Sequence, residues 1–305
     1  MFRGPVHVDT DCGVDDALAL AVLGQVANVA SVTTTWGNCS AAQAAANARY
    51  VLRRTGALGV PVVASTDAPP ESWTPSAVHG PDGMGGVLSL HPEFRSGESD
   101  AAAAIVSFAR EAGPKGRLLA IAPLSNLAQA YCIDPAALAA LDRIVVMAGH
   151  GLAARSAWLD DAGDTNTRHN PTATACIAAA ESLPVTWVGL DVTRWVVLGE
   201  PDFGASPLGA ELAELSAAYG AARADAYGYE PSGAGWRVPA HDTVASTALL
   251  IDDSFETCAA AAFVDKSSGT PVVRGSTSAA TRHLFATSPP APEMVGKLVR
   301  EALRR

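Results

Sequence analysis

The chain has 305 residues, 49% of them hydrophobic, and a formal net charge of −10. This length and hydrophobic share suffice for one large α/β domain. The negative charge, without runs of Lys or Arg, argues against nucleic acids and acidic membranes as partners. The start, Met1–Pro5, lacks a signal-peptide apolar region, and no later apolar run has the length of a membrane span. A cytoplasmic location is therefore expected.

The cysteines agree with that expectation. Five cysteines with scattered spacing favour neither a disulfide framework nor a zinc site, and free thiols suit a reducing compartment. Cys132, Cys176 and Cys258 lie in apolar stretches and are expected to be buried. Cys12 and Cys39 fall in predicted turns, where the pattern does not settle their exposure.

Predicted strands and helices alternate along the chain. We expect strands over 6–8, 29–35, 60–64, 117–122, 143–148 and 184–188. Between and after them we expect helices over 17–23, 41–54, 100–112, 171–181, 208–219 and 243–250, and a further helix that begins near residue 125. Late strands are expected over 255–264 and 271–274, and a final strand and helix within 284–304. Two irregular segments, 67–86 and 149–170, have the length of functional loops. The alternation predicts one Rossmann-like domain over residues 1–305, with a mostly parallel sheet and helices on both faces.

Four aspartates crowd the turn between the first strand and the first helix: Asp9, Asp11, Asp15 and Asp16. In parallel α/β sheets, ligand sites lie at the carboxyl ends of the strands. Like charges this close repel one another, so they predict a bound cation, and carboxylate oxygens suit Ca²⁺ or Mg²⁺. Gly13 allows the sharp turn. Helix capping explains one or two of these acids but not four, and the spacing does not fit an EF-hand loop.

The pattern Asp9-x-Asp11-x-Gly13-x-Asp15-Asp16 resembles the N-terminal signature of the inosine–uridine-preferring nucleoside hydrolase family, which usually has Pro where Cys12 stands. Further matches follow in chain order at Gly37-Asn38, His79-Gly80-x-x-Gly83-x-x-Gly86, Ile121–Asn126, Asp164-x-Asn166 and His241-Asp242. The resemblance implies Ca²⁺-dependent hydrolysis of a ribonucleoside to base and ribose through an oxocarbenium-like state. It also implies a role in salvage and a homodimer or homotetramer.

The resemblance further implies residue roles. Asp11, Asp16, the main-chain carbonyl of Ile121 and Asp242 would bind Ca²⁺, which activates water, with Asp11 as general base and His241 as candidate general acid. The nucleoside would contact Asp15, Asn38, His79, Met147, Trp158, Asp164, Asn166, Tyr229 and Trp236. The glycine-rich segment that starts at His79 would form a mobile cover over the substrate. Asp9 is expected to brace the turn.

Two positions depart from the family pattern near the 5′ side of the sugar. Asp164 stands where the family has Glu, and Trp158 lies near the place of a ribose-binding Asn. The sugar is therefore either bound differently or is not plain ribose. At Ile121 the family has Thr, but a main-chain ligand does not depend on the side chain.

Alternatives stay open on sequence alone. A hydrolase for a modified nucleoside in a specialised pathway, or a non-catalytic nucleoside-binding homologue, would share the motifs. A haloacid-dehalogenase-type phosphatase would use Asp9 as nucleophile, Asp11 as acid/base and Mg²⁺, but it needs a positioned Lys, and the three lysines lie in no convincing motif. Taken singly, Asn38, Asn126 and Asp242 can be helix caps, and each aromatic residue can be ordinary core.

Overall fold

The computed structural model describes residues 1–86, 99–152, 163–227, 235–267, 270–276 and 281–304. Eight strands form the central sheet: β1 (Pro5–Thr10), β2 (Asn28–Thr34), β3 (Val62–Ala64), β4 (Arg117–Ala120), β5 (Arg143–Met147), β6 (Val185–Val188), β9 (Thr257–Ala259) and β12 (Leu284–Ala286). Their spatial order is β3-β2-β1-β4-β5-β6-β12-β9. Neighbouring strands are parallel up to β12, and β9 joins β12 antiparallel. The mostly parallel sheet is thus confirmed.

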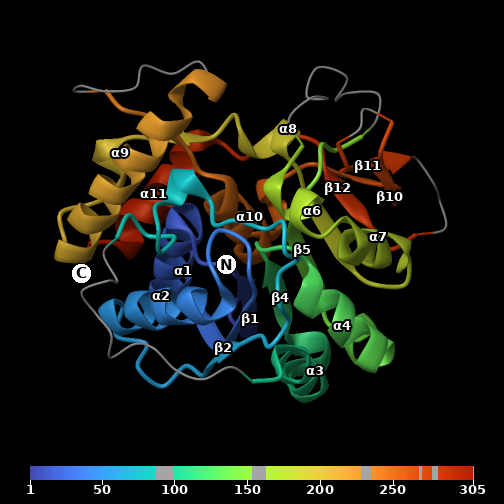
Figure 1. Cartoon of the computed structure of the whole chain (residues 1–305). Coiled ribbons are helices and arrows are strands. Elements are labelled where there is room, and N and C mark those ends of the chain that lie inside the picture. The colour runs from blue at the N-terminus through green and yellow to red at the C-terminus, as the bar shows by residue number, and fades with distance from the viewer. Residues whose placement is uncertain (87–98, 153–162, 228–234, 268–269, 277–280, 305) are drawn as a thin grey trace.

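Helices cover both faces of this sheet (Figure 1). One face carries α1 (Val14–Val26), α2 (Ala41–Arg54), α9 (Pro207–Tyr227), α10 (His241–Leu250) and α11 (Pro292–Ala302). The other carries α3 (Ala101–Ala112), α4 (Ser125–Ile133), α5 (Pro135–Ala139) and α7 (Pro171–Ala179). Among the described helices, none is long and apolar enough to cross a membrane.

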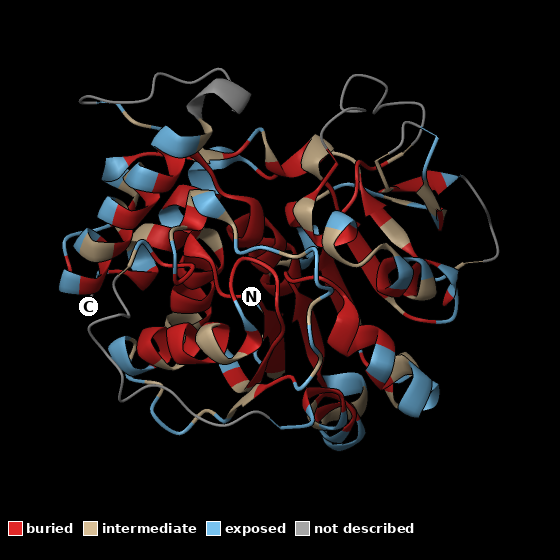
Figure 2. Cartoon of the chain, in the orientation of Figure 1, coloured by how far each residue is buried: buried red, intermediate tan, exposed pale blue. Residues whose placement is uncertain are grey.

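The two cores follow from the alternation of side chains along each strand. In β1, Val6 and Val8 belong to the core beneath α1. His7 points to the opposite face, where its ring lies 5.3 Å from that of Phe108. α1 is apolar on every side, and residues 16–23 are all buried, so it forms the centre of its layer (Figure 2). A helix this enclosed places its first turn accurately at the end of β1.

The late strands differ from the expectation. Residues 255–264, predicted as one strand, form β9 and then β10 (Ala261–Asp265), because the chain changes sheets at Ala260. β10 pairs antiparallel with β11 (Val272–Ser276), so a hairpin does form. A further short pair joins β7 (Val197–Leu198) to β8 (Val238–Pro239).

The burial expected for the cysteines was wrong. Cys132 is exposed, and Cys176 and Cys258 are half-buried, whereas Cys12 and Cys39 are buried. Apolar neighbours in sequence do not reveal which side of a helix faces the sheet, nor that Cys258 lies in β9, the strand at the edge of the sheet. The two turn cysteines lie beneath the ends of the strands, where the Cys39 thiol is 3.5 Å from the main-chain oxygen of Asp11.

Candidate active site

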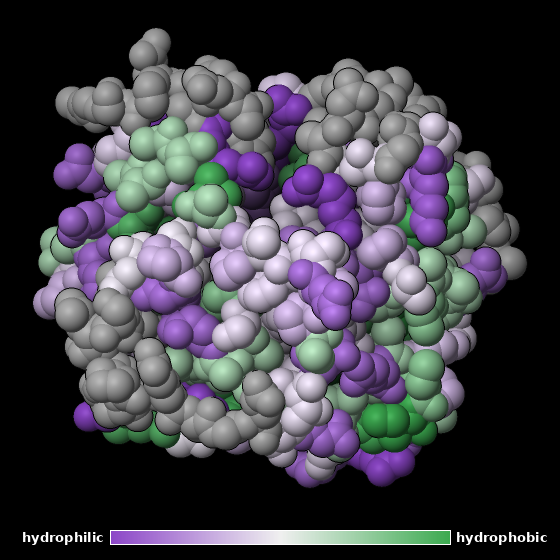
Figure 3. Space-filling model, in the orientation of Figure 1, coloured by the Kyte–Doolittle hydropathy of each residue, from purple (hydrophilic) through white to green (hydrophobic). Residues whose placement is uncertain are grey.

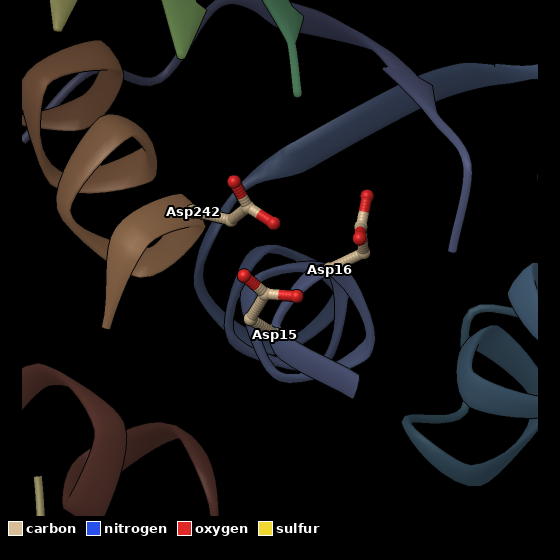
Figure 4. A group of neighbouring side chains, drawn as sticks. All are labelled: Asp15, Asp16 and Asp242. Atoms are coloured by element: carbon tan, nitrogen blue, oxygen red, sulfur yellow. The ribbon is translucent and has the colours of Figure 1, made fainter. Parts of the chain in front are cut away.

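Three carboxylates converge where two helices begin. Asp15 and Asp16 lie in the first turn of α1, and Asp242 lies in the first turn of α10, which packs beside α1. One oxygen of each lies within 4.8 Å of the others (Figure 4). Helix N-termini favour negative charge, but two such ends cannot offset three facing carboxylates. The cluster therefore has the character of a cation site.

Asp11 lies directly behind this cluster and is held by Asn38. The Asn38 main-chain N–H donates to Asp11 Oδ2 at 2.7 Å, and the Asn38 amide lies 3.2 Å from Asp11 Oδ1 and 3.3 Å from Asp16 Oδ2. Asp16 also accepts from the Thr10 hydroxyl at 2.5 Å and the Gly13 N–H at 3.0 Å. The turn thus fixes both carboxylates before any ligand binds.

The electrostatics of the cluster test whether a metal fits. Burial, and then the neighbouring Asp15, raise the pKa of Asp16 to about 7. Burial and nearby carboxylates likewise raise the pKa values of Asp11 and Asp242 well above their usual range. Buried acids that resist ionisation together become ionised when a divalent cation lies among them, and a set of hard oxygens fits Ca²⁺ or Mg²⁺. The residues present therefore fit such an ion.

A pocket of about 470 Å³ opens over the cluster. Predicted residues that line it are Asp15, Asp16, Asn38, His79, Ile121, Met147, Asp164, Asn166, His241 and Asp242. They come from the ends of β1, β2, β4 and β5 and from later helices, so the fold collects in one place what the sequence separates. This volume lies in the ordinary range of small-ligand sites.

Two histidines form one wall of the pocket. His241 Nδ1 lies 2.7 Å from the hydroxyl of Thr193, which ends α8 (Leu190–Thr193). His79 Nδ1 accepts from the Val14 N–H at 3.0 Å, and its ring is stacked on Tyr219 at 4.6 Å. Burial lowers both pKa values, that of His241 to about 4. Both rings are therefore neutral near pH 7.

Another part of the pocket lining comes from α6 (Thr165–His169) and its cap. The Asp164 carboxylate accepts from the N–H groups of Gly149 at 2.9 Å and Thr167 at 2.8 Å, so it caps α6. The Asn166 amide lies 3.0 Å from the carbonyl of Met147 and 3.2 Å from that of Ile121. A carbonyl has two lone pairs, so the Ile121 oxygen can accept this contact and still bind a cation.

The glycine-rich segment is anchored to the core along its described part. The Asp82 carboxylate accepts from the N–H groups of Met84 and Gly86, and the Met84 side chain is fully buried. Asn47 donates to the main-chain oxygens of Cys12 and Asp82, which ties this loop to the aspartate turn. Residues 74–79 line the pocket, residues 80–86 pack against the core behind them, and the expected mobile cover stays a prediction.

Other predicted residues lie elsewhere. The structure does not bring Trp236 to the pocket, because its ring packs on Phe203 at 5.5 Å. Trp158 and Tyr229 lie outside the described residues. Asp9 shares the face of His7 and is fully buried, where it accepts from Thr33 at 2.7 Å and Asn126 at 2.8 Å. It joins β1, β2 and α4, as a bracing residue would.

Sequence reasoning assigned no role to several pocket residues. Arg194, Tyr219 and Arg223 line the pocket, as does Arg168 of the motif around Asp164. Tyr219 and Arg223 are four residues apart in α9, so they share one face of that helix. That spacing was the available signal, but nothing in the sequence indicated which face of α9 meets the site.

The protein is thus an α/β protein with a mostly parallel sheet and a ligand pocket at the carboxyl ends of its strands, where three carboxylates cluster. Comparison with known families gives a match over residues 6–303 to the model described as inosine-uridine preferring nucleoside hydrolase. The chain therefore belongs to that family, as the resemblance implied.

Individual relatives agree. An inosine-uridine preferring nucleoside hydrolase of Leishmania major is 34% identical over 196 residues, which cover 62% of this chain and 61% of that protein. A probable uridine nucleosidase 2 of Oryza sativa subsp. japonica is 31% identical over 203 residues, covering 65% and 59%. The match thus spans about three fifths of these relatives' lengths.

Solved structures share the whole fold. A plant nucleoside hydrolase has a TM-score of 0.81 at 22% identity, with 99% of both chains covered. A purine-preferring ribonucleoside hydrolase from Gardnerella vaginalis has a TM-score of 0.79 at 21% identity, with 97% of this chain and 99% of that chain covered. At such identities the likeness establishes the arrangement of sheet and helices.

Proposed function

We propose that this protein hydrolyses the N-glycosidic bond of a ribonucleoside with the help of bound Ca²⁺. The observation that carries the proposal is the convergence of Asp15, Asp16 and Asp242 within 4.8 Å at the floor of a pocket that His241 and Asn166 also line. Membership of a nucleoside hydrolase family supports the same reaction. The names of two relatives, a probable uridine nucleosidase and an inosine-uridine preferring nucleoside hydrolase, suggest uridine and inosine as the first substrates to assay.

The chain's own residues supply the proton transfers. Asp11 accepts the proton of the attacking water, and its orientation is fixed by the two contacts from Asn38. A positioned general base contributes roughly 10²–10⁴-fold to a rate. The Thr193 contact orients His241, which is neutral near pH 7 because burial lowers its pKa to about 4. It therefore assists the departing base by donating a hydrogen bond from its N–H.

Asp16, Asp242 and the Ile121 carbonyl would hold the ion together with Asp11, and Asp15 completes the observed cluster. When bound, Ca²⁺ supplies positive charge that keeps these acids ionised and polarises water and sugar hydroxyls. Asp15, Asn38 and Asn166 line the pocket where they can hold the sugar. Asp164 contributes through its cap of α6, which holds Asn166 in place.

The phosphatase alternative loses its support. It requires Asp9 as an accessible nucleophile, but the Asp9 side chain is fully buried and hydrogen-bonded to Thr33 and Asn126 on the other face of the sheet. A non-catalytic binding protein would keep the pocket without turnover, and the assay below separates it from an enzyme.

The experiment is a panel of purine, pyrimidine and modified ribonucleosides, incubated with the protein and Ca²⁺, with reducing sugar measured against time. We expect release of ribose from at least one member and loss of more than 99% of that rate in Asp11→Asn, with the fold retained by circular dichroism. Tight binding without sugar release would contradict the enzymatic proposal. Substantial turnover by Asp11→Asn would contradict only the assignment of the base.

A further inference from the structure

The pocket of this acidic protein holds charges of both signs. The chain has a net charge of −10, yet three arginines, Arg168, Arg194 and Arg223, line the pocket together with Asp15, Asp16, Asp164 and Asp242. The face shown in Figure 3 is hollowed at its upper middle, and hydrophilic residues gather there. A protein of this overall charge repels anions at long range, so an anionic ligand needs such local cations to bind.

Arg194 and Arg223 face the histidine side of the pocket. Arg194 directly follows Thr193, whose hydroxyl contacts His241, and Arg223 lies one helical turn after Tyr219, which stacks on His79. Both cations are close enough to lower the pKa of His241, and Arg223 also lowers that of His79. Both side chains are half-buried. Two cations on separate elements thus lie close to His241 in the lining of one pocket.

A neutral nucleoside needs only hydrogen bonds at such a wall. Arginine is always charged, and its planar fork matches the two oxygens of a carboxylate or phosphate. The ring of Trp195 lies 5.3 Å from the Arg194 guanidinium, which restricts that side chain at the rim. We propose, on the basis of the proposed hydrolase function, that the preferred substrate is a nucleoside bearing an anionic oxyacid group, bound by Arg194 and Arg223.

Two sources of that group can be distinguished by substrate choice. Orotidine carries a carboxylate on the base, uridine 5′-monophosphate carries a phosphate on the sugar, and uridine carries neither. We expect kcat/KM for one charged nucleoside to exceed that for uridine, and the preferred one identifies the source. The preference should weaken as salt rises, because the attraction is electrostatic.

Variants test the two arginines directly. In Arg194→Gln and Arg223→Gln, the ratio of kcat/KM for the preferred charged nucleoside to that for uridine should fall roughly 10- to 100-fold, the worth of a charged hydrogen bond. Arg110→Gln is the matched control, because Arg110 is 63% exposed on α3, where it pairs with Asp134 away from the pocket. That change removes the same net charge and should leave the ratio unchanged.

The outcomes separate this inference from the function on which it rests. If uridine is cleaved best and both arginine variants lower all substrates in parallel, the arginines only balance the pocket's own carboxylates, and the inference is wrong while the hydrolase stands. If none of the nucleosides is cleaved, the affinity for charged and uncharged fragments still tests the inference about the arginines. Calorimetry should show tighter binding of orotate than uracil, or of ribose 5-phosphate than ribose, and equal binding within both pairs would overturn the inference.

Discussion

Gly37 lies directly against the side chain of Asp11. A Cβ at position 37 would overlap the Asp11 carboxylate, and the next residue, Asn38, is the one that donates to that carboxylate at 2.7 Å. The absence of a side chain at Gly37 therefore allows the loop after β2 to come close enough to hold Asp11, the proposed general base. This contact joins two turns that are 26 residues apart in the sequence, as the difference between positions 37 and 11.

Gly37→Ala should consequently lower kcat for hydrolysis while the protein still folds. The added methyl group must displace Asp11 or Asn38, and small displacements of catalytic groups cost about 10²-fold in rate. We expect kcat to fall by about that factor. Gly59→Ala is the control, because a Cβ there would have nothing within 4 Å. Equal activity of the two variants would show that Asp11 is not held as described.

Cys12 occupies a turn that proline cannot adopt. Its φ is 42°, its N–H donates to the Thr10 hydroxyl at 2.9 Å, and its carbonyl accepts from Asn47. Proline has a fixed negative φ and no N–H, whereas glycine adopts a positive φ without strain. We predict that Cys12→Pro destabilises the protein by roughly 3 kcal/mol and that Cys12→Gly costs much less. Urea unfolding would measure both, and an equally stable Cys12→Pro would refute the turn geometry.

His7 should make stability depend on pH. Thr33 donates to Asp9, so His7 Nε2 donates to the Thr33 hydroxyl at 2.9 Å and Nδ1 accepts from Ser31 at 2.8 Å, which fixes a neutral ring. Burial lowers the His7 pKa from 6.5 to about 3. The unfolded chain therefore binds this proton first, and the stability that neutral His7 provides is complete above pH 6.5 and is lost as pH falls toward 3.

The measurement compares wild-type protein with His7→Asn by urea unfolding at pH 7, 6 and 5. The wild-type protein should lose roughly 1.4 kcal/mol more than the variant per pH unit below 6.5. Other titrating groups are common to both proteins, so the difference isolates His7. Parallel pH profiles would mean that His7 is charged or accessible in the folded state.

The sequence was most informative where chemistry is local. Asp15 and Asp16 stand together after one strand, and His241 and Asp242 open a helix, so the pattern itself indicated the floor of the pocket. Asp9 belongs to the same run but serves the other face, because side chains alternate along β1 and the strand reaches Thr10. Because β1 ends at Thr10, Asp9 still lies on the strand and faces the other core, whereas Asp11 lies in the turn near Asp16.

Residues that act through tertiary contacts were harder to predict. Trp236 lies just before the His241 motif, yet its half-buried ring packs on Phe203 and does not line the pocket. Arg194 and Arg223 belong to no motif, and only the packing of α8 against α10 and of α9 against α1 brings them to the pocket. Cys132 shows the same limit, since an apolar neighbourhood did not reveal that it lies on an exposed side of α4.

The dependence of hydrolysis on bound Ca²⁺ can be measured by a calcium titration of metal-stripped protein, with bound Ca²⁺ and ribose release followed in the same samples. We expect one tightly bound Ca²⁺ per chain and a hydrolysis rate that rises in proportion to its occupancy. Asp242→Asn, which removes one of the three clustered carboxylates, should weaken Ca²⁺ binding and hydrolysis together. Full hydrolysis without any divalent cation, or stoichiometric Ca²⁺ binding with no ribose released from any nucleoside, would contradict the proposed Ca²⁺-dependent hydrolysis.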